Sequence, residues 1–289
     1  MNASLRTVGD YGRMVRVSHS VFALPFALAS AVFAASRAPL TAATVAWIVV
    51  AMVAARNAAM GFNRLADAAI DARNPRTASR EIPRGVLTRR RVALFVALLS
   101  ALFVFAAWRL NRTCLLLSPL ALAVVFLYSY TKRFTWGAQF FLGLSLAIAP
   151  IGAWIAIMGT IAGPALLLGL SVLCWVAGFD IIYALQDIEF DRREGLFSIP
   201  ARFGAARALV LARLLHVVTT VLLLALYFAV PLHPLYLAGV AAIAAMLFYE
   251  HTLVRPGDLS RINAAFFTTN GIVSVVYFVT AALAAALGR

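Results

Sequence analysis

The residues that decide the fold are 63–71, NRLADAAID, which close a long apolar segment of the chain. A similar stretch, YALQDIEFD at 183–191, closes another apolar segment in the second half. In both stretches a polar or aromatic residue is followed by an aspartate four positions later and by a second aspartate four positions after that. This spacing predicts that the three side chains share one face of a helix. They are Asn63, Asp67 and Asp71 in the first stretch, and Tyr183, Asp187 and Asp191 in the second.

The four aspartates stand out because the whole chain has only 11 acidic residues. Carboxylates directed at one place repel each other unless a cation neutralises them. Ligands that offer oxygen alone favour Mg²⁺, which keeps several waters and commonly takes its remaining ligands from phosphate groups. The two stretches therefore predict a magnesium-dependent site for a diphosphate. The alternative is that these aspartates are only charges at helix ends.

The composition predicts an all-α integral membrane protein. Hydrophobic residues make up 63% of the chain, charged residues 12%, and the mean hydropathy is +0.92, which lies outside the range of ordinary soluble domains. About nine apolar segments are long enough to cross a bilayer as helices. We expect them to form one bundle, a single domain over residues 1–289, around a cavity open to the cytoplasmic side. The segments are about 19–36, 41–70, 89–110, 113–131, 137–158, 163–186, 206–229, 235–254 and 264–287.

The N-terminal region and the cysteines carry little further chemistry. The first apolar segment lacks a short apolar core followed by a small-residue cleavage site, so we expect no removable signal peptide and a short cytoplasmic segment at 1–18. His19 is expected to be a polar residue at the membrane interface, and a catalytic base is the weaker alternative. Cys114 and Cys174 lie inside apolar runs, which predicts small buried side chains with neither a disulfide nor a zinc site.

The basic residues set the expected orientation. Most of the 25 Lys and Arg fall on loops and helix ends that share one side of the nine-span arrangement, and the positive-inside rule assigns that side to the cytoplasm. The net charge of +14 then reflects topology and attraction to anionic lipid, and no nucleic-acid-binding signature accompanies it. We expect a multi-pass protein of the inner, cytoplasmic membrane with its active site facing the cytoplasm.

A polar segment that contains arginines follows each acidic stretch, at 73–85 and 192–204. Each has Pro and Gly to turn the chain and Arg to bind phosphate oxygens in pairs. These are the longest polar segments in the sequence, and we expect them to act as lids over a cytoplasm-facing cavity.

A third motif, YSYTKRFT at 128–135, lies between the two acidic stretches. Together the three motifs resemble the UbiA superfamily of intramembrane prenyltransferases. The third of them is similar to the family's exit from its fourth helix, with Ser129 where proline is more frequent. The residues at 74–77 and 198–204 are closest to 4-hydroxybenzoate-type enzymes of quinone biosynthesis and also resemble relatives in the futalosine route to menaquinone. The first two motifs are Asn63-x3-Asp67-x3-Asp71 with Arg76, Thr77 and Arg80, and Asp180-x2-Tyr183-x3-Asp187-x3-Asp191.

The resemblance implies nine helices and Mg²⁺-dependent transfer of a polyprenyl group from a polyprenyl diphosphate to a hydroxylated aromatic carboxylate. By motif position the metal ligands are Asp67, Asp71, Asp187 and Asp191. The implied substrate-binding residues are Asn63, Arg76, Thr77, Arg80, Tyr128, Lys132, Arg133 and Ser198. Tyr183 or Tyr128 would stabilise an allylic cation through its ring, and Asp191 or Asp180 would accept the ring proton.

Arg56 is the one basic residue expected deep within a span. It precedes Asn63 by seven residues, two helical turns, so the two share a helix face. A charged residue at this depth usually faces a cavity and has a partner. We expect Arg56 to bind the acceptor's carboxylate or the diphosphate; the alternative is a structural ion pair with Asp180 or with one of the clustered aspartates.

Alternative hypotheses concern the identity of the acceptor substrate or the functional class of the protein. The acceptor is 4-hydroxybenzoate, 1,4-dihydroxy-6-naphthoate or another ring, and the sequence selects neither the prenyl chain length nor the oligomeric state. A lipid phosphotransferase would also use clustered aspartates, but its dense single motif is missing here. An ion-coupled transporter is the non-enzyme alternative, although transporter acids usually lie near the bilayer midplane.

Overall fold

The computed structural model describes residues 3–15 and 22–288. Within those ranges the chain is built from helices, and its one extended pairing is an isolated bridge between Arg255 and Asp258. Eight helical segments of the described chain are long and apolar enough to cross a membrane, which confirms the predicted all-α, multi-pass membrane fold. Their main helices are α3 (Ala42–Ala66), α5 (Arg89–Leu110), α6 (Arg112–Thr131), α7 (Ala138–Met158), α8 (Gly163–Ala184), α11 (Ala205–Ala229), α12 (Leu235–Thr252) and α13 (Asn270–Leu287).

The first predicted segment, 19–36, corresponds to a shorter apolar helix, α2 (Leu24–Ala34), of 11 residues. Residues 19–21, His19 among them, lie outside the described part of the chain. Pro25 occupies the first turn of α2, where its missing N–H has no intrahelical partner to lose. The described chain therefore matches eight of the nine expected spans with full-length helices, and the count of nine stays a prediction.

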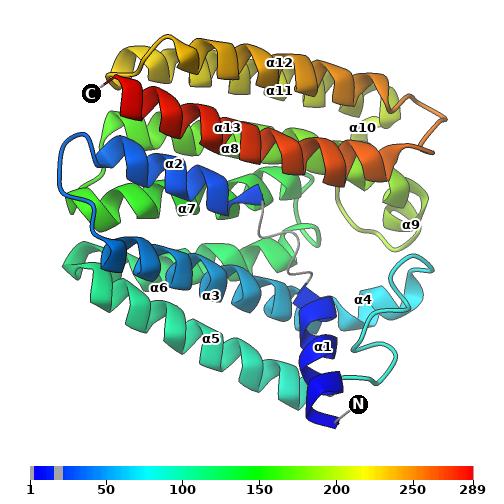
Figure 1. The fold of residues 1–289 in the computed structure, drawn as a ribbon. Helices are drawn as coiled ribbons and strands as arrows, with labels where there is room; N and C mark the ends of the chain where they lie inside the picture. Colours follow the sequence, from blue (N-terminus) through cyan, green and yellow to red (C-terminus); the bar gives the residue numbers. More distant parts are fainter. Residues whose placement is uncertain (1–2, 16–21, 289) are drawn as a thin grey trace.

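Helix α8 packs against both α7 and α11 and belongs to the largest buried cluster of the bundle (Figure 1). Gly143 of α7 permits the close approach of α7 to α8, because a Cβ there would lie 2.4 Å from the carbonyl oxygen of Leu173 on α8. Close approach through small residues is a usual way for helices to associate in lipid. Four of the largest fully buried side chains belong to the same cluster: Trp154, Trp175, Tyr236 and Tyr277.

The outer faces of the bundle are apolar as well. Leu98 is 62% exposed, Phe248 75% and Phe228 86%. Exposed apolar surface on this scale marks contact with a membrane or a partner. Long apolar helices that carry such side chains outward agree with a protein surrounded by lipid.

The short helices gather at one end of the bundle (Figure 1). They are α1 (Ala3–Val15), α4 (Ala68–Arg73), α9 (Ile188–Arg193) and α10 (Ile199–Phe203). α10 shows how the sequence builds this end: Ser198 caps its first turn by accepting from the N–H of Ala201 at 3.3 Å. Gly204, at φ +81°, ends the helix in a conformation that glycine adopts without strain. Both acidic stretches end here.

Candidate active site

Both acidic stretches lie where a long helix is interrupted. Asp67 alone separates α3 from α4 and has φ −93° and ψ 3°. Between α8 and α9 lies the 3-10 turn η2 (Leu185–Asp187), and Asp187 has φ −106° and ψ 6°. This sparsely populated backbone region is one where many active-site residues are found. The sequence predicts continuous helices through these points, whereas the structure shows a break at the first aspartate of each pair.

The interrupted ends surround a polar pocket of about 160 Å³. It brings together residues of α3, α4, α6, α8, α9 and the two polar segments. Arg133 lies outside this lining but donates to Asp67, and Arg56 lines a neighbouring cavity. The lining contains most of the site residues expected from the sequence: Asn63, Asp67, Asp71, Arg76, Thr77, Arg80, Tyr128, Lys132, Asp180, Tyr183, Asp187, Asp191 and Ser198.

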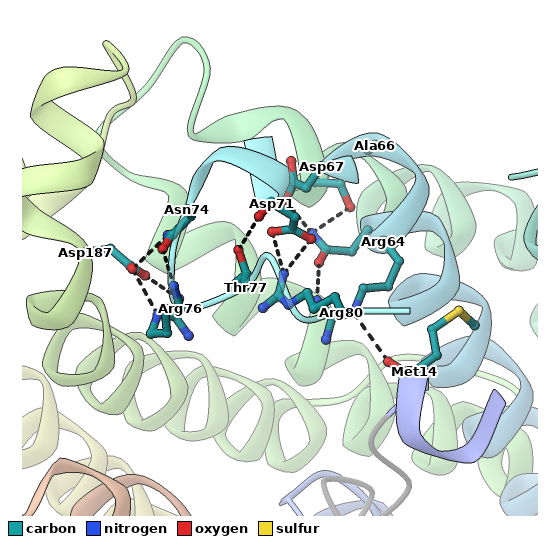
Figure 2. A network of polar contacts seen from close by, with 12 residues as sticks. Met14, Arg64, Ala66, Asp67, Asp71, Asn74, Arg76, Thr77, Arg80 and Asp187 are labelled. Carbon is teal, nitrogen blue, oxygen red and sulfur yellow. Dashed lines mark hydrogen bonds and ion pairs between the residues drawn. The ribbon is translucent and has the colours of Figure 1, made fainter. Parts of the chain in front are cut away.

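The aspartates of the first stretch are surrounded by positive charge (Figure 2). Asp67 accepts from the side-chain amide of Asn63 at 3.0 Å, and its other oxygen accepts from Arg133 at 3.2 Å. The ammonium of Lys132 lies 3.7 Å from Asp67. Both oxygens of Asp71 accept from Nη1 of Arg80 at 2.7 Å. Each of these two carboxylates is thus paired with at least one cation.

The aspartates of the second stretch have different partners. Asp187 accepts from the amide of Asn74 at 3.1 Å and from two nitrogens of Arg76 (Figure 2). Asp191 accepts from the hydroxyl of Ser198 at 2.9 Å and is 6% exposed. Asp187 is therefore tied to the polar segment that follows the first acidic stretch, and Asp191 to the segment that follows its own.

Arg76 joins the carboxylates to the aromatic wall. It donates to the hydroxyl of Tyr183 at 3.2 Å, and its guanidinium carbon lies 5.3 Å from the centre of that ring. Burial lowers the pKa of Arg76, but the hydrogen bond and charge of Asp187 outweigh it, so the net pKa is raised above its usual value. Arg76 is thus held as a cation at the edge of the pocket.

The donor set of the pocket fits Mg²⁺, which prefers oxygen ligands and is often held by only one or two carboxylates with waters and phosphates. Among the described residues no group of three or more His, Cys, Asp or Glu side chains is already gathered as a metal cage. Each aspartate is instead bonded to a cation, an amide or a hydroxyl. Oxygen donors that could hold a divalent cation therefore lie beside basic donors that could bind phosphate oxygens.

A larger apolar cavity of about 560 Å³ adjoins the polar pocket. Its walls come from α2, α3, α5, α6, α7, α8 and η3, and most of the lining is aliphatic. The cavity and the pocket meet at side chains that line both: Asn63, Arg80, Tyr128, Asp180 and Tyr183. A ligand with a charged head and a long apolar tail would fit across this junction.

Arg56 lines the apolar cavity and is tied to the N-terminal helix. Its Nη1 donates to the carbonyl oxygen of Val15 at 2.6 Å and to the side-chain oxygen of Asn57 at 2.9 Å. Arg56 thus faces the apolar cavity, and its role toward the acceptor or the diphosphate stays a prediction. Cys114, expected to be buried, is half-buried in the lining of the same cavity.

Sequence reasoning missed two contributors to the site. Asn74 donates to Asp187 and lines the polar pocket; its position directly before the Pro75-Arg76 turn is the signal that would have found it. Phe266 lines the apolar cavity and stacks on Tyr183 with ring centres 4.1 Å apart. Nothing in the spacing of the C-terminal apolar segment distinguishes Phe266 from its neighbours.

The fold and site define a multi-pass membrane enzyme with a cation-rich acidic pocket beside an apolar cavity. The chain matches the UbiA prenyltransferase family over residues 23–272. It belongs to that family and is a prenyltransferase, as the motifs at 63–80 and 180–191 predict.

The chain is similar to UbiA-type proteins both in amino-acid sequence and in fold. The 4-hydroxybenzoate octaprenyltransferase of Tolumonas auensis is 30% identical over 222 residues, 77% of each chain. The apo structure of a UbiA homolog from Aeropyrum pernix has a TM-score of 0.84 at 33% identity, covering 91% of this chain and 97% of that one. A UbiA homolog from Archaeoglobus fulgidus, solved with GPP and Mg²⁺, has a TM-score of 0.74 at 20% identity, covering 96% and 99%.

Proposed function

We propose that this prenyltransferase moves a polyprenyl group from polyprenyl diphosphate onto 4-hydroxybenzoate or a closely related hydroxylated aromatic carboxylate, in ubiquinone or menaquinone biosynthesis. The observation that carries the proposal is the junction between the two cavities, where a pocket for charge meets a cavity for an apolar chain. The name of the Tolumonas auensis relative supports 4-hydroxybenzoate as the acceptor.

The polar pocket suits a diphosphate with Mg²⁺. When bound, Mg²⁺ supplies positive charge that offsets the charge of the leaving diphosphate. Arg76, Arg80, Lys132 and Arg133 each pair with one of the aspartates. Their forked or ammonium donors can turn to phosphate oxygens when the aspartates bind metal. The Archaeoglobus fulgidus neighbour, solved with GPP and Mg²⁺, supports this assignment.

The chain's own residues then support carbon–carbon bond formation. The allylic C–O bond breaks, and the bonding pair leaves with the diphosphate, which the basic side chains stabilise. Tyr183 and Tyr128 line the junction and present aromatic faces to the cation-like carbon. A ring carbon of the acceptor attacks, and its proton passes to a carboxylate, either Asp180 at the junction or Asp191 in the polar pocket.

The apolar cavity holds the prenyl tail. The guanidinium of Arg56, which lines the same cavity, has a role in binding the acceptor. Arg56 projects from α3 into the lining of that cavity, where the acceptor's carboxylate would otherwise be buried without a partner. We assign Arg56 to that carboxylate. Membership of a prenyltransferase family disfavours the transporter and phosphotransferase alternatives.

The experiment is a prenyl-transfer assay with purified protein in detergent, Mg²⁺ and geranyl diphosphate, against 4-hydroxybenzoate and 1,4-dihydroxy-6-naphthoate. We expect a prenylated product from 4-hydroxybenzoate that disappears with EDTA and in Asp67→Ala and Asp187→Ala. Product from the naphthoate alone would move the acceptor to the futalosine-type alternative. Absence of product from either ring, with diphosphate binding intact, would contradict the acceptor class; absence of both would contradict the whole proposal.

A further inference from the structure

Outside the polar pocket, a hydrogen-bonded set of buried polar side chains connects three helices, α8, α12 and α13. Asn270, the first residue of α13, is 0% exposed, and its side-chain oxygen accepts from the indole N–H of Trp175 on α8 at 2.7 Å. Its amide nitrogen donates to Oε1 of Glu250 on α12 at 2.9 Å. Because an indole nitrogen can only donate, the contact with Trp175 fixes which way the amide of Asn270 points.

The same amide also binds the backbone of a π-helical turn. The turn, η3 (Ala264–Thr269), runs directly into α13. Asn270 Nδ2 lies 3.0 Å from the carbonyl oxygen of Ala265 and 3.3 Å from that of Phe266. π-Helical turns are rare and frequently occur at functional sites, and a wider turn disturbs the regular pairing of carbonyls. Asn270 therefore holds the backbone of Phe266 in place.

Phe266 lines the apolar cavity beside the junction, where it contacts Tyr183. Its ring stacks on Tyr183 with a 4.1 Å centre-to-centre distance and a 29° interplanar angle, and it meets Phe179 edge-on at 5.3 Å. Tyr183 in turn receives the hydrogen bond from Arg76. A continuous set of contacts thus leads from the buried chain on α8, α12 and α13 to the residue that we place beside the allylic carbon.

We propose that Asn270, held by Trp175 and Glu250, is a positioning residue that sets Phe266 behind Tyr183, so that the aromatic pair keeps water from the allylic carbon and leaves it to the acceptor ring. The inference rests on the proposed function. Where the pair is misplaced, water forms the new C–O bond: prenyl diphosphate and water give prenyl alcohol, inorganic diphosphate and a proton.

The ratio of prenyl alcohol to prenylated ring tests this role, because a merely structural residue would lower both products together. Asn270→Leu removes every polar contact of the side chain at similar volume. Glu250→Leu removes the carboxylate that accepts from Asn270, whereas Glu250→Gln keeps a side-chain oxygen that can accept the same hydrogen bond. Thr219→Val is the matched control: Thr219 is a buried polar residue of α11 that donates to backbone carbonyls away from η3.

In Asn270→Leu and Glu250→Leu we expect the alcohol-to-product ratio to rise about tenfold, the scale of a small displacement of reacting groups. Glu250→Gln should return the ratio to that of the unmodified protein. Thr219→Val should keep the original ratio even where its thermal midpoint falls as far as that of Asn270→Leu.

An unchanged ratio in Asn270→Leu would overturn the proposal. If that variant fails to fold, Phe266→Leu tests the wall with the Asn270 chain intact, and the same rise in the ratio is expected; an unchanged ratio there overturns the proposal too. Failure of the unmodified protein to make any prenylated ring would instead count against the proposed function, so the two outcomes are distinguishable.

Discussion

Asp187, in the second acidic stretch, accepts hydrogen bonds from side chains that follow the first acidic stretch. Asn74 and Arg76 come from the segment after the first acidic stretch, yet both donate to this aspartate of the second. A second contact connects the two polar segments directly: Arg73 and Glu194 form an ion pair at 2.7 Å. The two motifs therefore form one site, and a change in either segment should be felt by the carboxylates of both.

Arg80 gives the sharpest test at the scale of single residues. It binds both oxygens of Asp71 and lines the junction of the two cavities. We expect Arg80→Gln to lower kcat/KM for prenyl transfer by about 10²–10³-fold, the usual effect of removing one donor to a developing anion. Arg84 is exposed on the same segment and outside both linings, so Arg84→Gln is the control. Equal losses in the two variants would contradict a specific role for Arg80.

The sequence identifies the carboxylates of this site better than their partners. Aspartates at fixed spacing are conspicuous in a chain poor in acid, because carboxylates grouped at the ends of apolar helices are unfavourable unless a cation neutralises them. The pairing of Asn74 with Asp187 and the stacking of Phe266 on Tyr183 depend on helices distant in sequence. Periodicity along one helix contains no information about which other helix lies beside it.

The short helix α10 couples the second polar segment to the pocket. Ser198 both caps this helix and donates to Asp191. Ser198→Ala should remove both bonds, destabilise α10 by about 1 kcal/mol and lower prenyl transfer. Hydrogen exchange at 199–203 measures the first effect and turnover the second.

A second cap separates those two effects. Thr88 caps α5 by accepting from the N–H of Arg91 at 3.3 Å and has no contact with the aspartates. Thr88→Ala should raise exchange at the start of α5 and leave turnover within about twofold, since loss of an exposed cap is a local effect. A loss of turnover as large as in Ser198→Ala would mean that capping alone, and not the bond to Asp191, accounts for the phenotype.

Two glycines of α7 make opposite predictions for the packing of this element. A Cβ at Gly143 would lie 2.4 Å from a backbone oxygen of α8, whereas one at Gly152 meets nothing within 4 Å and faces the apolar cavity. Gly143→Ala should destabilise the protein by about 1–3 kcal/mol through overpacking, seen as a lower thermal midpoint in detergent. Gly152→Ala should not lower the midpoint. A midpoint unchanged in Gly143→Ala would show that α7 and α8 can separate without cost.

At the scale of elements, hydropathy predicts where helices lie but not where they break. The apolar segments at 89–110 and 113–131 coincide closely with α5 and α6. The interruptions at Asp67 and at η2 cannot be seen in hydropathy, because hydropathy records polarity and not backbone geometry. The helices thus break at the first aspartate of each pair, which we propose as metal ligands, and there the structure differs from the continuous helix expected from the sequence.

The whole molecule has two chemically different ends. The short helices, both polar segments and the pocket gather at one end, and the connection between α2 and α3 lies at the other (Figure 1). Most of the Lys and Arg in the sequence belong to the pocket end. Basic loops are retained on the cytoplasmic side during insertion, so we propose that the pocket faces the cytoplasm.

Two exposed serines at opposite ends test this orientation. Ser36 lies between α2 and α3, and Ser260 lies between α12 and η3 at the pocket end. In a background with Cys114→Ala and Cys174→Ala, an impermeant maleimide added to intact cells should label Ser36→Cys and reach Ser260→Cys only after permeabilisation. The identical chemistry of the two substitutions makes each the control for the other. The reverse labelling would place the basic end, with its polar pocket, outside the cytoplasm, and would contradict both the proposed orientation and the interpretation of the charge pattern.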